Sequence, residues 1–424
     1  MDDLGERIRA LPGADRLVPA LDGLAPAWLV GGAVRDLMLG GTSVDLDVAI
    51  EGDAREVARE LAARLSGEAR EHERFGTATV RAGDLVVDLA STRRETYAQP
   101  GALPDVEEAP LDEDLARRDF TINAMAVSLN EPRIGELRDP HGGRGDLEAG
   151  VIRILHPKSF VDDPTRLLRA IRYESRFGFR MDDETERLAR EAIAAGAPST
   201  VSGARIRDEL LDMLGETERA APGGSSTGST GARPPAPAIA RMRDLGLDRA
   251  LSPLLGDARP EDVAAAAEAA EHVGGQRRFA ALAALVAPDP DDLAGWVEDL
   301  HLRAEDRDAV LHAARKGPQL VRALEPALPD SALHALLHCE LPETFAVAIA
   351  LGARSEPIER YLEQLSSAGL EITGDDLRSA GIPESPAIGR ALRETLKRKL
   401  DGEVAGRDEE LASALEVARE ELAR

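Results

Sequence analysis

The chain has 424 residues, enough for about two to four domains with a sizeable core, and a formal net charge of −26 at pH 7. This acidity argues against a general nucleic-acid binder, although a local basic groove is compatible with it. No apolar run reaches membrane-spanning length, the acidic N-terminus lacks a signal-peptide pattern, and the single cysteine, Cys339, excludes an internal disulfide framework. We therefore expect a cytoplasmic protein with no membrane partner.

The first predicted elements are a short helix over residues 2–11, a strand over Ala27–Val30 and a helix over Val34–Leu39. Between the last two, Gly31 and Gly32 let the backbone approach a phosphate closely. Gly32 and Arg35 could then grip a triphosphate at the N-terminus of the helix. A glycine pair by itself is often only a turn.

The next predicted strand carries two aspartates. Asp45 and Asp47 alternate with Val44, Leu46 and Val48, so both carboxylates project from one face while the apolar side chains are buried on the other. Adjacent carboxylates repel each other unless a cation lies between them. Mg²⁺ commonly binds one or two carboxylates together with substrate phosphates. Such a pair can also be only a solvated edge.

Together the two features are more specific. An apolar residue, two glycines, twelve further residues and then Asp45-Leu46-Asp47-Val48 resemble the signature of the nucleotidyltransferase superfamily that includes DNA polymerase β. Downstream, Asp53 caps a predicted helix through Arg64, and strands follow over residues 77–81 and 85–90. Asp88 on the second of these strands would lie beside the aspartate strand if the sheet pairs as a meander. It is either a third carboxylate of the site or a polar residue on an exposed face.

Residues 92–115 contain three prolines, a glycine and a run of acids, and are predicted to be a flexible loop. Arg117, Arg118 and Asp119 open the apolar stretch that follows. They are either simple helix-end charges or a site in which an arginine holds the triphosphate or ribose and Asp119 positions its neighbour. Residues 139–143 are predicted to be a turn and residues 151–155 a strand.

A second block begins at residue 162. Asp163 and Pro164 are a good helix start, and arginines recur along the helix at positions 166, 169, 172 and 176. Like charges at this spacing are unfavourable unless an anion compensates them. We therefore interpret the stripe as a contact with polyphosphate or RNA, against the alternative of a solvated face.

From Asp183 onward the chain is predicted to be helical, interrupted at residues 222–237 by a low-complexity linker or insertion. The histidines of this half lack metal-ligand spacing. Its best candidate for an RNA contact is the basic run Lys397-Arg398-Lys399, although a solvated face explains that run as well.

Several blocks, VGGAVRDLMLG, SVDLDVAIEG, ARRDFTINAMA, DPHGGRGDL and DDPTRLLRAIRYESRFGF, resemble the class II CCA-adding tRNA nucleotidyltransferase and bacterial poly(A) polymerase family. They occupy residues 28–180 in the family's order. The resemblance implies an α+β fold: a DNA polymerase β-like head with a mixed sheet over 1–155, a helical, nucleotide-selecting neck over 156–221, the linker at 222–237, and an all-helical, RNA-binding body and tail over 238–424.

The resemblance also implies roles for individual residues. Asp45 and Asp47 would bind two Mg²⁺ and activate the RNA 3′ hydroxyl. The nucleotide-binding set would be Gly32, Arg35, Arg118, Asp119, Asp163, Arg166, Arg169 and Arg172. Within it, Asp163 and Arg166 would pair with the edge of the incoming base, one accepting and one donating. Asp163 also looks like a helix cap, and both roles coexist only if one carboxylate oxygen stays free.

This chain departs from the family by having Asp162 and Ala204 where glutamates are usual. The leading interpretation is a CCA-adding enzyme that takes CTP and ATP and acts on the acceptor arm of tRNA. A CC-adding enzyme, an A-adding enzyme and a poly(A) polymerase stay open. The intact length of the 92–115 loop favours a switch from C to A. A catalytically silent RNA-binding relative and a transferase acting on a small molecule or a protein are less favoured, given the intact Asp45 and Asp47 and the arginine stripe.

Overall fold

The computed structural model describes residues 3–42, 45–72, 76–216 and 235–423. The chain divides into two compact units, one of residues 1–256 with 299–301 and the other of residues 257–298 with 302–424. Within the described ranges, no helix is both long and apolar enough to cross a membrane. The domain boundaries expected at 155 and 221 stay predictions.

A mixed sheet forms the centre of the first unit, with the strand order β3-β4-β5-β2-β1-β8-β9. Its strands are β1 (Ala27–Val30), β2 (Leu46–Ile50), β3 (Glu68–His72), β4 (Thr77–Ala82), β5 (Leu85–Ser91), β8 (Ala126–Ser128) and β9 (Leu137–Arg138). β2 and β5 run parallel, and the other neighbours run antiparallel. The strands predicted over 27–30, 77–81 and 85–90 are confirmed. β3 was not predicted, because its sequence EAREH has no alternating apolar residues.

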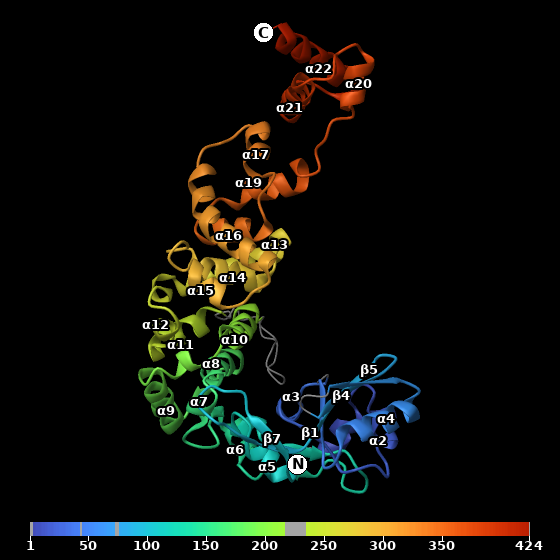
Figure 1. Ribbon diagram of the computed structural model, residues 1–424, viewed down its shortest axis with the longest axis vertical. Coiled ribbons are helices and arrows are strands. Elements are labelled where there is room, and N and C mark those ends of the chain that lie inside the picture. The colour runs from blue at the N-terminus through green and yellow to red at the C-terminus, as the bar shows by residue number, and fades with distance from the viewer. Residues whose placement is uncertain (1–2, 43–44, 73–75, 217–234, 424) are drawn as a thin grey trace. The chain divides into compact units, whose positions relative to one another are not determined.

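The two faces of this sheet are covered differently. Helix α4 (Ala54–Leu65) packs against β3, β4 and β5, where Val80, Val87 and Leu89 are buried (Figure 1). On the opposite face α5 (Leu111–Ala116) packs Leu111 and Leu115 against β1, β2 and β8. The β3–β4–β5 part of that face carries the exposed, polar side of the sheet. The predicted N-cap at Asp53 is confirmed, since its carboxylate accepts from the Arg55 backbone N–H at 2.9 Å.

The prediction of a flexible loop over 92–115 is wrong. β6 (Arg93–Thr96) and β7 (Asp105–Glu108) pair antiparallel, and α5 follows. Arg94 and Glu107 lie opposite each other across this hairpin and form an ion pair of 2.5 Å. Pro100, Gly101 and Pro104 lie in its turn and Pro110 precedes α5, so composition alone gave the wrong expectation for the paired arms.

The first helix was predicted over 2–11, where the structure has α1 (Leu4–Arg9), followed by α2 (Ala14–Ala20). The strand predicted over 151–155 is shorter than expected. α8 packs against α7, α10 and α11. The remaining elements of this region are α3 (Gly32–Met38), η2 (Thr121–Asn123), α6 (Gly143–Ala149), β10 (Val151–Ile152), α7 (Ser159–Asp162), α8 (Thr165–Phe177), β11 (Arg180–Met181), α9 (Asp183–Ala194), η3 (Ala197–Thr200), α10 (Gly203–Gly215), α11 (Ala236–Leu245), α12 (Leu247–Leu251) and η4 (Leu255–Asp257).

The second unit is helical, as predicted. Its helices α13, α14, α16 and α18 pack on one another, and α20, α21 and α22 share a separate apolar cluster around Leu377 and Ala414. Of the linker predicted at 222–237, residues 222–234 lie outside the described residues, and α11 begins at Ala236. The helices are α13 (Pro260–Val273), α14 (Arg277–Val286), α15 (Ala294–Asp299), α16 (Ala304–Ala323), α17 (Asp330–Leu337), α18 (Pro342–Ala350), α19 (Ser355–Arg360), η5 (Tyr361–Leu365), α20 (Gly374–Ser379), α21 (Pro386–Leu400) and α22 (Gly406–Ala423).

Candidate active site

A pocket of about 360 Å³ opens on the polar face of the sheet. The register places Asp47 of β2 beside Asp88 of β5, and Asp88 beside Thr79 of β4, so the three side chains form a row across neighbouring strands. Thr79 donates its hydroxyl to Asp88 Oδ1 at 2.5 Å. Asp88 lies beside the aspartate strand, but the meander on which that expectation depended is wrong, because β2 and β5 pair in parallel.

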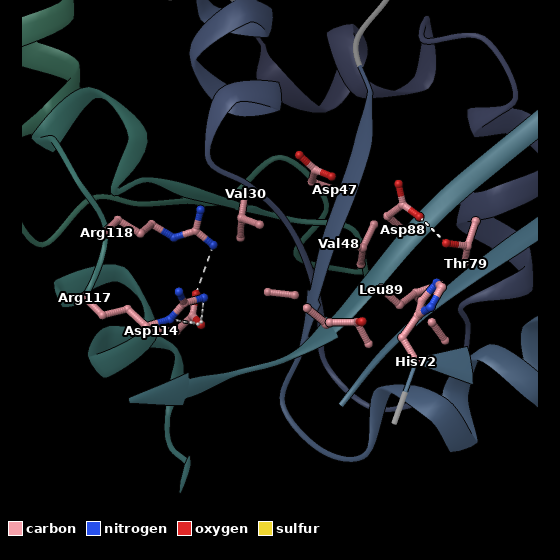
Figure 2. A pocket seen from close by; sticks show the side chains of 14 residues that line it. Val30, Asp47, Val48, His72, Thr79, Asp88, Leu89, Asp114, Arg117 and Arg118 are labelled. Carbon is pink, nitrogen blue, oxygen red and sulfur yellow. Dashed lines mark hydrogen bonds and ion pairs between the residues drawn. The ribbon is translucent and has the colours of Figure 1, made fainter. Parts of the chain in front are cut away.

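The walls of this pocket differ in chemistry. Figure 2 shows Asp114, Arg117 and Arg118 on one side of Asp47, with Asp88, Thr79 and His72 on the other. The carboxylates of the row and the guanidinium groups of the opposite wall thus face the same space. A site of this kind can hold a cation and an anionic group together.

The surroundings of Asp47 disfavour its charged form. Partial desolvation raises the pKa of Asp47, and the neighbouring charges of Asp88 and Asp45 raise it further, while Arg118 lowers it. Asp45 is exposed and precedes β2, with its carbonyl accepting from the Asp47 N–H at 3.0 Å. Val44, expected on the buried side, lies outside the described residues, whereas Val48 is buried as predicted.

This charge set fits a hard divalent cation. A cation bound beside Asp47 would offset the neighbouring charges of Asp88 and Asp45. In the described part of the chain, no group of three or more His, Cys, Asp or Glu side chains forms a cage that could hold a metal ion. Mg²⁺ does not need such a cage, because it keeps waters and takes substrate phosphates as ligands.

Arg118 reaches the backbone of the glycine turn. Gly31 has φ +66°, and a Cβ there would lie 2.6 Å from Arg118 Nη1, so only glycine permits this approach. Arg118 Nη2 donates to buried Asp114 at 3.0 Å. Burial raises the pKa of Asp114, but Arg118 and Arg117 outweigh it and the net shift is downward. Arg118 is therefore the predicted nucleotide ligand that the structure places in the pocket.

Arg35 is placed elsewhere. Its side chain is buried and donates to Asn123 Oδ1 and Asp36 Oδ1, both at 2.8 Å. Its guanidinium carbon lies 5.0 Å from the ring centroid of Tyr173 and 4.8 Å from that of Phe177. These contacts tie α3 to α8, so Arg35 acts in packing, and the neighbouring Gly32 borders Arg35, not the pocket.

Asp119 is a buried junction between η2 and α8. Its carboxylate accepts from the Phe120 N–H at 2.8 Å, from Asn123 Nδ2 at 3.0 Å and from Arg169 Nη1 at 3.2 Å. Burial raises the pKa of Asp119, but Arg169 and these donors outweigh it, so the net shift is downward. Asp119 thus positions its neighbours, as one interpretation of the sequence expected. Its role in binding the nucleotide stays a prediction.

The side chains of the predicted base-reading residues, Asp163 and Arg166, do not bond each other, whereas the Arg166 backbone N–H donates to the Asp163 carbonyl at 3.1 Å. Asp163 Oδ1 accepts from the Thr165 N–H at 3.1 Å and from Arg205 Nη2 at 2.7 Å, whereas no described residue donates to Oδ2. A free oxygen is the condition under which capping and base reading coexist. Buried Arg166 donates to Ser159 Oγ at 2.7 Å and to the Arg117 carbonyl at 2.9 Å.

The arginine stripe of α8 is compensated from within the protein. Arg169 Nε donates to Glu209 Oε1 at 3.0 Å, and Arg172 Nη2 donates to Glu209 Oε2 at 3.1 Å. Glu216 lies 3.4 Å from Arg172 and 3.6 Å from Arg176. The interpretation as a polyphosphate or RNA contact assumed an anion from a ligand, whereas Glu209 and Glu216 supply one within the protein, and the contact itself stays a prediction. That interpretation considered neighbours along one helix, and Glu209 comes from α10.

Sequence reasoning also missed Glu95 and Tyr97 of the 92–115 segment. Glu95 Oε1 accepts from Arg117 Nη1 at 2.8 Å, and Tyr97 donates to Glu95 Oε2 at 3.1 Å. Burial and the charge of Glu95 raise the pKa of Tyr97 to about 12. The available signal was the cluster of charged residues in RRET, which also fits a hairpin arm.

The basic run of the tail is neutralised. Lys397 pairs with Glu394 at 2.9 Å, and Lys399 pairs with fully buried Glu410 at 2.6 Å. Arg398 pairs with Glu416 at 3.0 Å. The run therefore stabilises the packing of α21 and α22, and the interpretation as an RNA contact is not favoured.

Residues 27–153 match the model of the Poly A polymerase head domain. The chain is 36% identical over 415 residues to an A-adding tRNA nucleotidyltransferase of Geobacter sulfurreducens, covering 93% of this chain and 45% of that protein. It is 33% identical over 405 residues to an A-adding tRNA nucleotidyltransferase of Halalkalibacterium halodurans, covering 93% and 88% respectively. The chain thus spans less than half of the first relative and most of the second.

The fold is also similar to that of the Thermotoga maritima CCA-adding enzyme complexed with tRNA. The TM-score is 0.70 at 31% sequence identity, and the match covers 97% of this chain and 94% of that one. The similarity therefore extends over both units and is not confined to the sheet.

Proposed function

The chain belongs to the tRNA nucleotidyltransferase family, and we propose that it adds C and A from CTP and ATP to the 3′ end of tRNA without a nucleic-acid template. The observation that carries this proposal is the pocket in which Asp47 and Asp88 face Arg118 across a common space. The carboxylates can hold a cation beside the reacting oxygens, and the guanidinium can bind the phosphates of the nucleotide. A tRNA substrate also fits a cytoplasmic location.

Asp45 and Asp47, with Asp88 beside them, would hold Mg²⁺. When bound, the metal ions lower the pKa of the attacking 3′ hydroxyl and neutralise charge on the α-phosphate and the leaving pyrophosphate. The protein keeps the carboxylates in place by pairing β2 with β5, and Thr79 fixes the rotamer of Asp88 by its hydrogen bond. Arg118 orients the triphosphate against the glycine turn at Gly31.

Selection of the base is proposed to use Asp163 and Arg166 on the first turn of α8. The free Oδ2 of Asp163 accepts from an amino group of the base. Arg166 exchanges its bond to Ser159 or to the Arg117 carbonyl for one to the base. Arg169 and Arg172 bind phosphate only when their ion pairs with Glu209 break, so nucleotide binding competes with these internal ion pairs.

Addition of the terminal A alone is a second candidate, favoured by two A-adding relatives that each match over 93% of this chain. The test incubates the purified protein with three tRNA transcripts, ending before CCA, after C and after CC. CTP and ATP are supplied separately and together, and the products are sequenced.

Complete CCA on all three transcripts supports the first candidate. A single A on the CC transcript alone supports the second. Long A tracts indicate a poly(A) polymerase, and the absence of any product contradicts nucleotide addition.

A further inference from the structure

The sheet face that carries Asp47 and Asp88 continues beyond the pocket onto β4 and β3. Following the register outward from Asp47, one row runs through Asp88 and Thr79 to Arg70, and the neighbouring residues of β4 and β3 on this face are Arg81 and His72. We call Arg70, His72, Thr77, Thr79 and Arg81 the β3–β4 face. Because α4 packs on the other side of these strands, this face is open, and both arginines and His72 are exposed.

The arginines of this face lack the ion pairs that most other described arginines make. Among the described residues, the guanidinium groups of Arg70 and Arg81 have no hydrogen-bond or ion-pair partner. Glu68 lies opposite Arg81 in the register and on the same face of the sheet. On the covered side of the same strands, Arg59 pairs with Glu71 at 3.4 Å, and Arg55 pairs with Asp53 at 3.2 Å. In a chain of net charge −26, two unpaired guanidinium groups on one open strand pair are ready to bind an anion.

The position of this face decides which anion fits it. In phosphoryl transfer, the attacking and leaving oxygens lie roughly in line on opposite sides of the phosphorus atom. Arg118 and Gly31 hold the triphosphate on one side of Asp47, so the attacking hydroxyl approaches from the side of Asp88, Thr79 and His72 (Figure 2). A strand that enters from this side passes over β4 and β3, and three strand spacings of roughly 5 Å each place Arg70 about 15 Å from Asp47 along the row.

We propose that the β3–β4 face binds the phosphodiester backbone of the RNA strand whose 3′ hydroxyl is extended, with Arg70 and Arg81 as its phosphate contacts. This proposal rests on the proposed function and extends it. It assigns a track for the RNA within the catalytic sheet, in addition to any surface of the helical half. Thr77 contributes a hydroxyl along the same path.

The test measures initial rates of the full chain with tRNA and with nucleotide varied in turn, for wild type and for the double variant Arg70→Ala, Arg81→Ala. We expect the KM for tRNA to rise about five- to tenfold, while kcat and the KM for CTP and ATP stay unchanged. Fluorescence anisotropy with tRNA should give a plot of log affinity against log salt that is shallower by about 1.4, the value for two single-strand phosphate contacts.

Two further double variants serve as controls. Arg55→Ala, Arg59→Ala removes the same charge from the covered side of these strands and should leave the KM for tRNA unchanged. Arg70→Lys, Arg81→Lys keeps the charge and should retain most of the RNA affinity. Thermal melts of all variants verify that they are folded.

The proposal is overturned if the KM for nucleotide rises and that for tRNA does not, because the arginines then serve the triphosphate or pyrophosphate. It is equally overturned if no parameter changes, or if the control at Arg55 and Arg59 weakens RNA binding to the same extent. A wild-type protein that extends no tRNA refutes the proposed function instead. The anisotropy measurement then still decides whether RNA contacts this face.

Discussion

The carboxylate of Glu209 is predicted to restrain the arginine stripe of α8 at the expense of nucleotide affinity. It accepts from Arg169 and Arg172, and its side chain is 11% exposed, against 30% and 13% for the two arginines. Removing one partner of a buried ion pair costs about 3–5 kcal/mol, and the partial exposure of Arg169 places the expected loss at the lower end, about 3 kcal/mol. For a unit of this size, that corresponds to a fall in melting temperature of roughly 6–12 °C.

Glu209→Gln keeps the shape of the side chain and removes the charge. We expect the fall in melting temperature in the absence of ligand, together with tighter binding of CTP or ATP, because the phosphates no longer compete with a carboxylate. Differential scanning fluorimetry with and without nucleotide measures both effects. The matched control, Glu394→Gln, removes an exposed carboxylate that pairs only with Lys397 and should change the melting temperature by less than about 2 °C.

The reasoning about the stripe is refuted by either of two results. An unchanged melting temperature for Glu209→Gln would mean that the ion pairs do not stabilise α8 on α10. A destabilised variant whose nucleotide affinity is unchanged or weaker would mean that Glu209 does not compete with the ligand, and that Arg169 and Arg172 are structural in the bound state as well.

Three further predictions concern single residues. Arg35→Ala should lower the free energy of unfolding by about 2–3 kcal/mol, through loss of a buried hydrogen bond and ring stacking, with little change in the KM for nucleotide; urea denaturation and initial rates check this. Arg398→Ala should leave tRNA affinity unchanged in an anisotropy titration. Arg169 holds the pKa of Asp119 below its usual range. The ion pair therefore stabilises the fold at pH values above the usual carboxyl pKa, and this stabilisation is lost as pH falls through the folded-state pKa. Urea midpoints should therefore drop more steeply below about pH 4 for wild type than for Asp119→Asn.

Local pattern was sufficient for the elements that define the pocket. The alternation in residues 44–50, the capping aspartate at position 53 and the strands over 77–81 and 85–90 depend on neighbours in sequence. The structure has β2 at residues 46–50, a helix after Asp53 and strands β4 and β5, while Val44 lies outside the described residues and Asp45 precedes β2. The adjacency of Asp47 and Asp88 was also anticipated. The parallel pairing that creates it was not, because periodicity carries no information on strand direction.

What failed depended on partners distant in sequence. The spacing of the arginines on α8 was right, but Glu209, 40 residues beyond Arg169, neutralises them. Arg35 follows the glycine turn in sequence, yet its guanidinium is buried against the rings of Tyr173 and Phe177. Such contacts follow from the packing of helices and strands on one another, which one-dimensional pattern does not contain.

The central claim is that Asp45 and Asp47 carry the chemistry and do not simply bind RNA. The most direct measurement compares wild type with Asp47→Ala for incorporation of labelled CTP and ATP into tRNA lacking CCA, with tRNA affinity determined in parallel by anisotropy. The account predicts that the variant binds tRNA as wild type does and incorporates no label. Incorporation by Asp47→Ala at a rate near that of wild type would contradict it.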